Sequence, residues 1–196
     1  RNAYDDDDFL PVYHAVINFG AVGHSALYFD IAKDRLYCGA RDSIRRRATQ
    51  TVMYDTLSSL ALVLAPVLSY TSDEIWQAMP GHGSDASVLL ADFPTPDPEW
   101  SDDTLMRRWE RVWEVRSEVT KALEAKRSAG AIGHSLEARV RLTVTEADRE
   151  VLAAVGIEEL EAVFIVSQVE LANGGALGGE VLGPLGAKCG RGWHYR

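Results

Sequence analysis

The spacing of apolar side chains predicts helices in the N-terminal part of the chain. Val12, Val16 and Phe19 recur at helical spacing, and Asp8 before them is a residue type that caps helix N-termini. We therefore expect a helix that begins close to Asp8 and ends before a turn that starts at Gly20.

Two further helices are expected beyond that turn. Leu27, Ile31 and Tyr37 have the spacing of one helix face. Ser43 is a suitable N-cap for the next helix. Pro66 interrupts that helix, because proline removes a backbone donor and crowds the preceding turn.

A fourth helix is expected to restart at residues 71–74 (TSDE), which have the form of a capping box. Ile75, Trp76 and Met79 follow as its apolar side chains. The prolines and glycines of residues 80–100 then indicate a linker or a surface crossing.

The second half of the chain changes character. From Ser101 to about Arg127, apolar side chains follow one side of a long amphipathic helix, which Gly130 ends. Residues 139–145 alternate as a strand does, and residues 162–171 indicate a second strand, with a short helix between the two.

The predicted fold class is mainly α, with a helical domain followed by a small α+β module. The expected boundaries are 1–98 for the helical domain with its proline-rich linker and 99–172 for the α+β module. Residues 173–196 are expected to form a glycine-rich loop and a tail that contains one cysteine.

The composition is that of an ordinary globular protein. Hydrophobic residues make up 46% and charged residues 25%, which argues against wholesale disorder. Cys38 and Cys189 are far apart in the sequence, which argues against a disulfide-stapled secreted scaffold. No signal peptide is recognisable, and no stretch approaches the ~18 apolar residues of a membrane span. We expect a soluble cytoplasmic protein.

The net charge of −9 conceals a strong asymmetry along the chain. Residues 33–47 hold six Lys or Arg against two Asp, and residues 107–127 hold seven against four Glu. Residues 85–103 carry six acidic residues and no Lys or Arg. Because local potential steers a polyanion over a Debye length of ~8–10 Å, an acidic chain can still bind RNA on one face.

Four arginines within seven residues are the strongest candidates for phosphate contact. Three of them follow the expected N-cap directly, and at ~100° per residue they fan across about half of the helix. Guanidinium groups match phosphate oxygens in a bidentate manner. The alternative is a solvated helix face. The candidate contacts are Arg41, Arg45, Arg46 and Arg47, with Lys126 and Arg127 as a second patch.

The tail has the form of an incomplete metal-binding knuckle. Cys189 is followed by Gly192, where a Cys-x-x-Cys pair would have its second thiolate. A lone thiolate is half a site, so zinc is expected only if further ligands lie outside this chain. Arg191 offers charge and Trp193 a flat surface on which an unpaired base can stack. The alternative for Trp193 is packing against the α+β module.

Sequence motifs for catalysis are missing. The sequence has no P-loop, no Gly-x-Gly-x-x-Gly after a strand and no Gly-x-Ser-x-Gly elbow. We therefore do not expect this chain to be active as an enzyme by itself.

Several longer segments are specific enough to indicate a family. These segments are 26–37 (ALYFDIAKDRLY), 46–52 (RRATQTV), 64–69 (LAPVLS), 72–76 (SDEIW), 133–138 (GHSLEA) and 188–195 (KCGRGWHY). They resemble the C-terminal part of bacterial isoleucyl-tRNA synthetases, a class I aminoacyl-tRNA synthetase family. The first four are typical of the branch that contains the isoleucine, valine and leucine enzymes, and the last two favour the isoleucine member.

The resemblance implies a fold and a partner. Residues 9–80 would form a helical-bundle anticodon-binding domain, and the long helix and strands a junction domain before a zinc-binding subdomain. The implied partner is the anticodon arm of isoleucine tRNA, with the basic residues on its phosphates and the tail on its loop bases. No membrane or DNA partner is expected.

The resemblance also implies a parent enzyme that uses ATP and Mg to attach isoleucine to tRNA and that hydrolyses mischarged valine. The catalytic domain with its HIGH-like and KMSKS-like motifs is missing from this chain, and so is the editing domain. Gly192 stands where the family usually has the second cysteine of the knuckle.

Three alternatives stay open. A helical protein-interaction module without RNA binding would bind its partner independently of salt, whereas phosphate contacts weaken log-linearly with salt. A second alternative is a piece that regains aminoacylation beside its catalytic half. The third is the equivalent region of a valine- or leucine-type synthetase.

Overall fold

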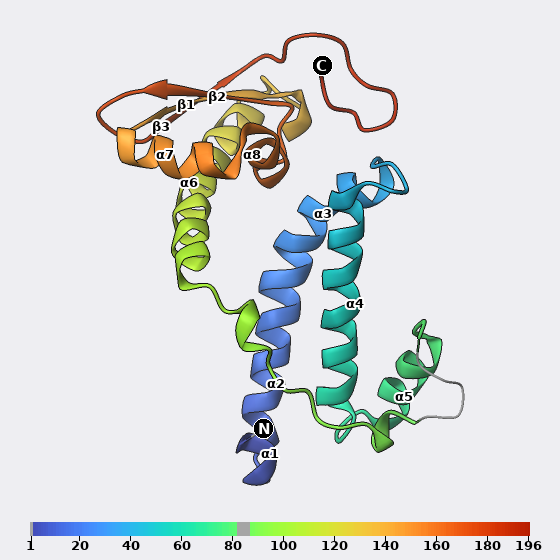
Figure 1. The fold of residues 1–196 in the computed structure, drawn as a ribbon. Helices are drawn as coiled ribbons and strands as arrows, with labels where there is room; N and C mark the ends of the chain where they lie inside the picture. Colours follow the sequence, from blue (N-terminus) through green and yellow to red (C-terminus); the bar gives the residue numbers. More distant parts are fainter. Residues whose placement is uncertain (1, 82–86) are drawn as a thin grey trace. The chain divides into compact units, whose positions relative to one another are not determined.

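The computed structural model describes residues 2–81 and 87–196, with only the backbone described for residues 22–26. The chain divides into two compact units (Figure 1). Unit 1 combines Arg1–Cys38 with Asp103–Arg196, and unit 2 is the continuous segment Gly39–Asp102. Whether the chain folds as the three domains expected from its sequence stays a prediction, because these units describe packing and not independent folding.

Unit 1 begins with a long helical run. The Asp8 carboxylate accepts the Leu10 N–H at 3.2 Å, so the expected cap is confirmed. The turn expected at Gly20 is wrong, because the chain continues through that position in wider π-helical turns. Glycine lowers helix propensity by only about 1 kcal/mol and does not require a turn. The elements are α1 (Asn2–Asp5), α2 (Phe9–Ile17), the π-helical η1 (Asn18–Tyr28) and α3 (Phe29–Tyr37).

Unit 2 is built on helices α4 (Ile44–Leu64) and α5 (Ser69–Ala78), followed by the short 3-10 turns η2 (Val88–Leu90) and η3 (Pro98–Trp100). Ser43 precedes α4, as predicted. Residues 82–86 of the expected linker lie outside the described residues.

The capping box expected at residues 71–74 is wrong, because α5 already begins at Ser69. Asp73 instead accepts hydrogen bonds from the Ser87 hydroxyl at 2.7 Å and the Val88 N–H at 2.9 Å. These bonds hold the pKa of Asp73 below its usual range. Asp73 therefore connects α5 to η2, whose Val88 belongs to the small apolar core of this unit.

The C-terminal part of unit 1 contains a three-stranded sheet in the order β2-β1-β3. The central strand β1 (Arg139–Val144) pairs in parallel with β2 (Gln168–Asn173) and antiparallel with β3 (Gly178–Leu182). The first strand was predicted. The second begins later than expected, and β3 lies in a glycine-rich stretch that was expected to be a loop.

Helices α6 (Asp103–Ser128), α7 (Glu146–Val155) and α8 (Ile157–Phe164) accompany this sheet, with the 3-10 turn η4 (Ser135–Glu137) before β1 (Figure 1). The second strand is shifted because α8 extends to Phe164 and ends at Ile165 in a left-handed conformation. Apolar residues that favour strands therefore end a helix here, since tertiary packing overrides local propensity.

One face of the sheet forms the core of unit 1. Val140, Leu142 and Val144 of β1 are fully buried together with a stripe of valines on α6. Ile31 of α3 joins this core, which makes the N-terminal helix part of the same unit. Among the described residues, every helix is too short or too polar to cross a membrane. The predicted fold class, mainly α with a small α+β module, is confirmed.

Candidate nucleic-acid interface

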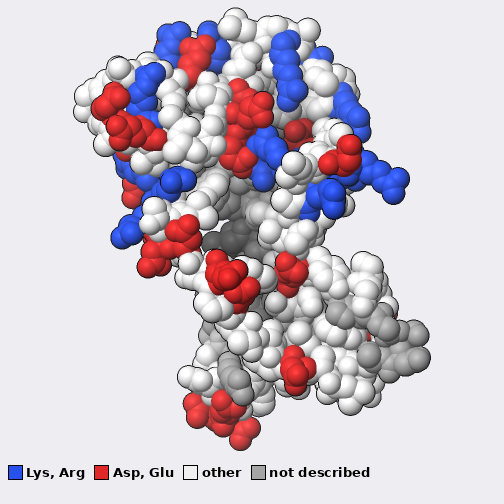
Figure 2. Space-filling view, in the orientation of Figure 1, with Lys and Arg blue, Asp and Glu red and all other residues white. Residues whose placement is uncertain are grey.

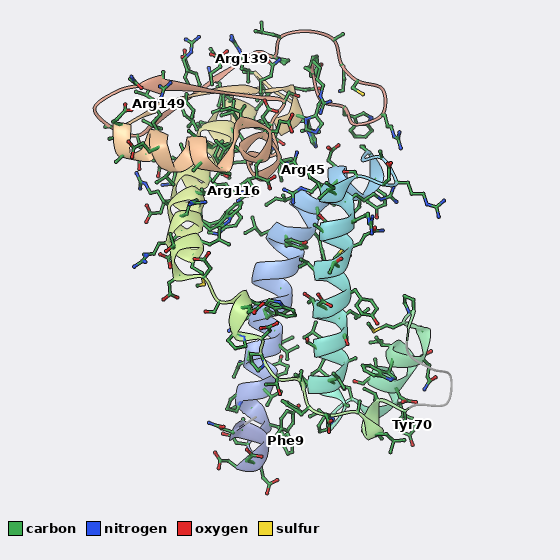
Figure 3. The ribbon with its side chains drawn as sticks, viewed as in Figure 1. Phe9, Arg45, Tyr70, Arg116, Arg139 and Arg149 are labelled. Atoms are coloured by element: carbon green, nitrogen blue, oxygen red, sulfur yellow. The ribbon has the colours of Figure 1, made fainter. Side chains whose placement is uncertain are left out.

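The four arginines predicted to contact phosphate lie together at the start of α4. Arg41 is in the turn before the helix, and the other three occupy its first turn. Arg45 is labelled at this end of the helix in Figure 3. Arg41, Arg45 and Arg47 are exposed, whereas Arg46 is half-buried.

The charge distribution of unit 2 is extreme. All of its Lys and Arg residues are these four arginines, whereas eight of its nine acidic residues follow in the sequence from Asp55 onwards. Figure 2 shows the positive and negative side chains on one face of the molecule. An anion that approaches unit 2 is therefore attracted to the start of α4 and repelled by the rest of the unit.

This arrangement does not favour helix stability. The N-terminus of a helix carries the positive end of its macrodipole, where cations are unfavourable by roughly 0.3–1 kcal/mol each. In the described structure the Ser43 hydroxyl makes no capping bond, and the first intrahelical bond runs from the Arg47 N–H to the Ser43 carbonyl at 3.0 Å. The N-terminus of α4, without a side-chain cap bond from Ser43, thus lies in the same short segment as the four arginines, a combination that suits a polyanion.

Arg46 differs from its neighbours, since it serves the turn before the helix. Its guanidinium donates to the Gly39 carbonyl at 3.3 Å, and its Nε is buried. The half-buried side chain thus closes the turn 39–43. Of the four arginines, Arg41 and Arg47 are the most directly available to a phosphate.

Lys126 and Arg127, the predicted second patch, lie in unit 1 in the last turn of α6. Arg127 forms an ion pair with Glu124. The helix ends in a Schellman motif, with Gly130 at φ +70° and the Ala131 N–H donating to the Lys126 carbonyl at 3.0 Å. Cations are favourable at a helix C-terminus, so the helix dipole stabilises these two side chains, whereas it opposes the arginines at the start of α4.

Other arginines of unit 1 are neutralised on the exposed face of the sheet. Arg139, which is labelled in Figure 3, pairs with Glu170 at 2.6 Å. Arg141 contacts Glu170 at 3.2 Å and Glu180 at 3.7 Å, one on each neighbouring strand. These arginines sit between carboxylates and offer little net charge to an anion.

Arg191 and Trp193 lie at the tip of a tail hairpin, residues 187–196. Its two arms are joined by the bridge between Lys188 and Tyr195 and by two hydrogen bonds between Ala187 and Arg196. Trp193 adopts φ +60°, which is uncommon for a bulky residue. The residue is 59% exposed, so the hairpin does not bury Trp193.

Lys188 was not among the candidate contacts proposed from the sequence, although it belongs to the basic and aromatic tail segment 188–195. Its Nζ lies 6.0 Å from the centroid of the Trp193 ring and 5.9 Å from that of Tyr195, close enough for cation–π attraction. The same amine is 3.5 Å from the Glu137 carboxylate. Its place beside the cysteine in the tail was the signal that could have identified it.

The donor set of the tail does not fit a zinc ion. Cys189 accepts backbone N–H groups from Gly192 and Arg191, which hold the pKa of its thiol below the usual range. Gly192, at the second position of the knuckle, supplies no ligand atom. Within the part of the chain that the structure describes, no group of three or more His, Cys, Asp or Glu residues is placed to hold a metal ion. Zinc needs four ligands in a structural site.

The predicted residues thus form three sets. The four arginines are together in unit 2, whereas the end of α6 and the tail hairpin are separate parts of unit 1. Of these three sets, the start of α4 is the one that combines several cations with a helix N-terminus.

Comparison with known proteins identifies a family and several relatives of this chain. Residues 1–142 match the family described as the anticodon-binding domain of tRNA ligase. Proteins named isoleucine–tRNA ligase are similar to the whole chain. Those of Syntrophotalea carbinolica and Geobacter sulfurreducens are 44% identical over 205 and 204 residues, covering 100% and 98% of this chain. That of Desulfitobacterium hafniense is 42% identical over 206 residues, covering 98%.

The chain spans 22% of the length of each of these curated relatives.

Proposed function

Because the chain belongs to the family of anticodon-binding domains of tRNA ligases, we propose that it holds the anticodon arm of isoleucine tRNA for a parent isoleucine–tRNA ligase. Arg41, Arg45 and Arg47 contact backbone phosphates in this proposal, and Arg46 shapes the turn that presents them. The tail hairpin contributes Arg191 and Trp193 to the bases of the anticodon loop.

The observation that carries the proposal is the gathering of every cation of unit 2 at the start of α4. Arg46 has a role in the turn before the helix, but the helix dipole disfavours the accumulation of four cations at this end. A phosphate backbone removes this repulsion, because it brings negative charge to the guanidinium groups and to the uncapped N–H groups.

The role of the chain in the reaction is positioning. Attachment of an amino acid to tRNA by the parent enzyme consumes ATP with Mg, in a catalytic domain that this sequence does not contain. Holding the anticodon arm orients the acceptor end toward that domain and so contributes to the rate through proximity and orientation. We propose that this activity takes place in the cytoplasm. We also propose that the chain itself binds no ATP, Mg or zinc.

Salt dependence of tRNA binding tests the proposal. Each phosphate contact on single-stranded RNA adds roughly 0.7 to the slope of log K against log salt concentration. The double variant Arg41→Ala/Arg47→Ala is therefore expected to lower the slope by about 1.4. Arg141→Ala is the matched control, because that guanidinium is already paired with two carboxylates. The slope of log K against log salt concentration is expected to be the same in this variant as in the parent chain.

The specificity arm compares isoleucine tRNA with a version that has a different anticodon. Weaker binding to the swapped tRNA supports anticodon recognition. Binding that does not depend on salt and is equal for both RNAs would contradict the proposal and favour a protein-interaction module.

A further inference from the structure

The tail hairpin meets the C-terminal end of α3 through several direct contacts. The Cys38 thiol donates to the Arg191 carbonyl at 3.7 Å. The Arg191 guanidinium donates to the Tyr37 carbonyl at 3.4 Å. The His194 Nε2 lies 3.7 Å from the Asp34 carboxylate, and the His194 side chain is only 14% exposed. The tip of the hairpin thus rests on one helix end within unit 1.

Gly192 lies at the centre of these contacts. A Cβ at this position would lie 3.1 Å from the Asp34 carboxylate oxygen, 3.6 Å from the Cys38 sulfur and 3.6 Å from the His194 ring. The glycine is not in the left-handed region, so its backbone does not demand glycine. What favours glycine is the close approach of the helix end, because a β-carbon would have to displace the Asp34 carboxylate slightly and a larger side chain would displace it further.

We propose that Asp34, Tyr37 and Cys38 form a seat that fastens the tip of the tail hairpin in place of a metal ion, and that glycine at position 192 is what allows the tip to sit there. In a metal knuckle, two thiolates around one ion fix the turn. Here only Cys189 remains, and the contacts with α3 supply the constraint that the second thiolate would have given.

The base of the hairpin is held separately. The Tyr195 N–H donates to the Ser167 hydroxyl at 2.8 Å, and that hydroxyl donates to the Leu136 carbonyl at 2.6 Å. The Gln168 side-chain amide exchanges two hydrogen bonds with the Leu185 backbone, at 2.9 and 3.0 Å. Loss of the seat therefore releases the tip and leaves the arms attached to the sheet.

The seat acts as a positioning device for the proposed RNA contacts. Arg191 and Trp193 flank Gly192, so the orientation of both side chains depends on where the tip rests. This step depends on the proposed function, whereas the existence of the seat does not.

The reactivity of Cys38 tests the seat without RNA. All chains carry Cys189→Ser, so that Cys38 is the one remaining thiol. Gly192→Val is expected to raise the rate of its reaction with Ellman's reagent about tenfold, because a tip that no longer docks exposes the sulfur. Gly190→Val is the matched control, since open space surrounds the Cβ position of Gly190, and its rate stays within about twofold of the parent.

Asp34→Ala is a second variant that does not depend on how valine is tolerated at the tip. It removes the partner of His194 and is expected to raise the Cys38 rate as well. If Cys38 reacts with Ellman's reagent at the same rate in Gly192→Val, Asp34→Ala and Gly190→Val, and circular dichroism is unchanged, the proposal of a seat is wrong.

The claim that contacts with α3, and not a metal ion, hold the hairpin tip is tested on the chain that keeps both cysteines. Trypsin cleavage after Arg191, followed by mass spectrometry, is expected to proceed at the same rate in zinc sulfate and in EDTA. Cleavage that zinc slows would overturn the statement that the helix end replaces the metal.

The positioning of RNA contacts has its own readout. Gly192→Val is expected to lose the discrimination between isoleucine tRNA and its anticodon-swapped version, while the salt slope set by the arginines of α4 persists. Discrimination that persists although Cys38 reacts faster would overturn the positioning role. If the unmodified chain binds no tRNA, the proposed function fails, and the thiol measurement alone decides on the seat.

Discussion

The link between α6 and α7 gives the sharpest test of how unit 1 is held together. Arg111 contacts Asp148 through two charge-assisted hydrogen bonds, Nε to Oδ1 at 2.6 Å and Nη2 to Oδ2 at 2.8 Å. The Asp148 side chain is 11% exposed and also accepts the Thr145 hydroxyl at 3.0 Å. Asp148→Asn keeps the shape of the side chain and removes its charge.

The magnitude follows from these contacts. A hydrogen bond to a charged group contributes roughly 1.5–3 kcal/mol. Arg111 is 35% exposed and keeps Glu114 as a second partner, so the lower end of this range applies to the pair as a whole. Asp148 also lies in the first turn of α7, where an acidic residue adds roughly 0.3–1 kcal/mol. We expect Asp148→Asn to lower the free energy of unfolding by about 2–2.5 kcal/mol.

Urea unfolding followed by tryptophan fluorescence measures this change, because Trp109 and Trp113 lie on α6 beside Arg111. With a denaturant slope of about 2 kcal/mol per M, the midpoint should fall by ~1–1.5 M. Glu114→Gln is the matched control. It removes the other carboxylate from the same arginine, but Glu114 is 64% exposed, so a loss of at most ~0.5 kcal/mol is expected.

The pH dependence of the difference is a second check. The hydrogen bond from Arg111 holds the pKa of Asp148 below its usual range. A carboxylate with a depressed folded pKa stabilises the protein fully above its unfolded pKa, about 3.9, and the contribution is lost as the pH falls through the folded pKa. The gap between the parent and Asp148→Asn should therefore be constant from neutral pH to about 4 and shrink below it. Equal midpoint shifts for the Asn and Gln variants would refute this reasoning.

Three further outcomes are expected. Leu142→Ala, in the fully buried face of β1, should lower the free energy of unfolding in urea by ~2–5 kcal/mol, and a loss below 1 would contradict the core assignment. Gly130→Ala, at φ +70°, should cost about 1 kcal/mol in the same assay, whereas Gly175→Ala, in open space, should cost little. At pH 7.5 iodoacetamide should alkylate Cys189 before Cys38, because backbone N–H groups lower the pKa of Cys189 and burial raises the pKa of Cys38. Faster alkylation of Cys38 would contradict these two pKa shifts.

Local signals in the sequence were sufficient for the elements that depend on local chemistry. The cap at Asp8, the start of α4 after Ser43 and the first strand each follow from a residue type or an alternation that acts within a few positions. The resemblance to isoleucyl-tRNA synthetases is likewise confirmed, because it rested on whole segments.

The errors arose where distant contacts decide the local structure. The stretch around Gly178 became a strand because β1 offers it an antiparallel partner. Residues 162–164 ended a helix and did not begin a strand, since Val163 and Phe164 are buried in the core. Neither partner is visible in a local window of sequence.

The same distinction applies to the candidate site. The arginine cluster was predictable because its members are consecutive. That Arg46 closes a turn and that the hairpin tip rests on α3 was not, because the latter contact joins residues more than 150 positions apart, such as Cys38 and Arg191. The roles of the individual residues in tRNA binding stay predictions.

The discontinuous make-up of unit 1 has a consequence for synthesis on the ribosome. Ile31 finishes its packing only with a core built from residues after 112, and Arg35 pairs with Glu159, 124 positions later. At about 5–20 residues per second, α3 waits roughly 6–25 s after translation before its partner emerges. Unit 2 is continuous and has its own small core, so it can begin to fold during this interval. Within this chain, the helices up to Tyr37 are therefore made before unit 2 and are buried after it, so their apolar side chains stay exposed for longer during translation.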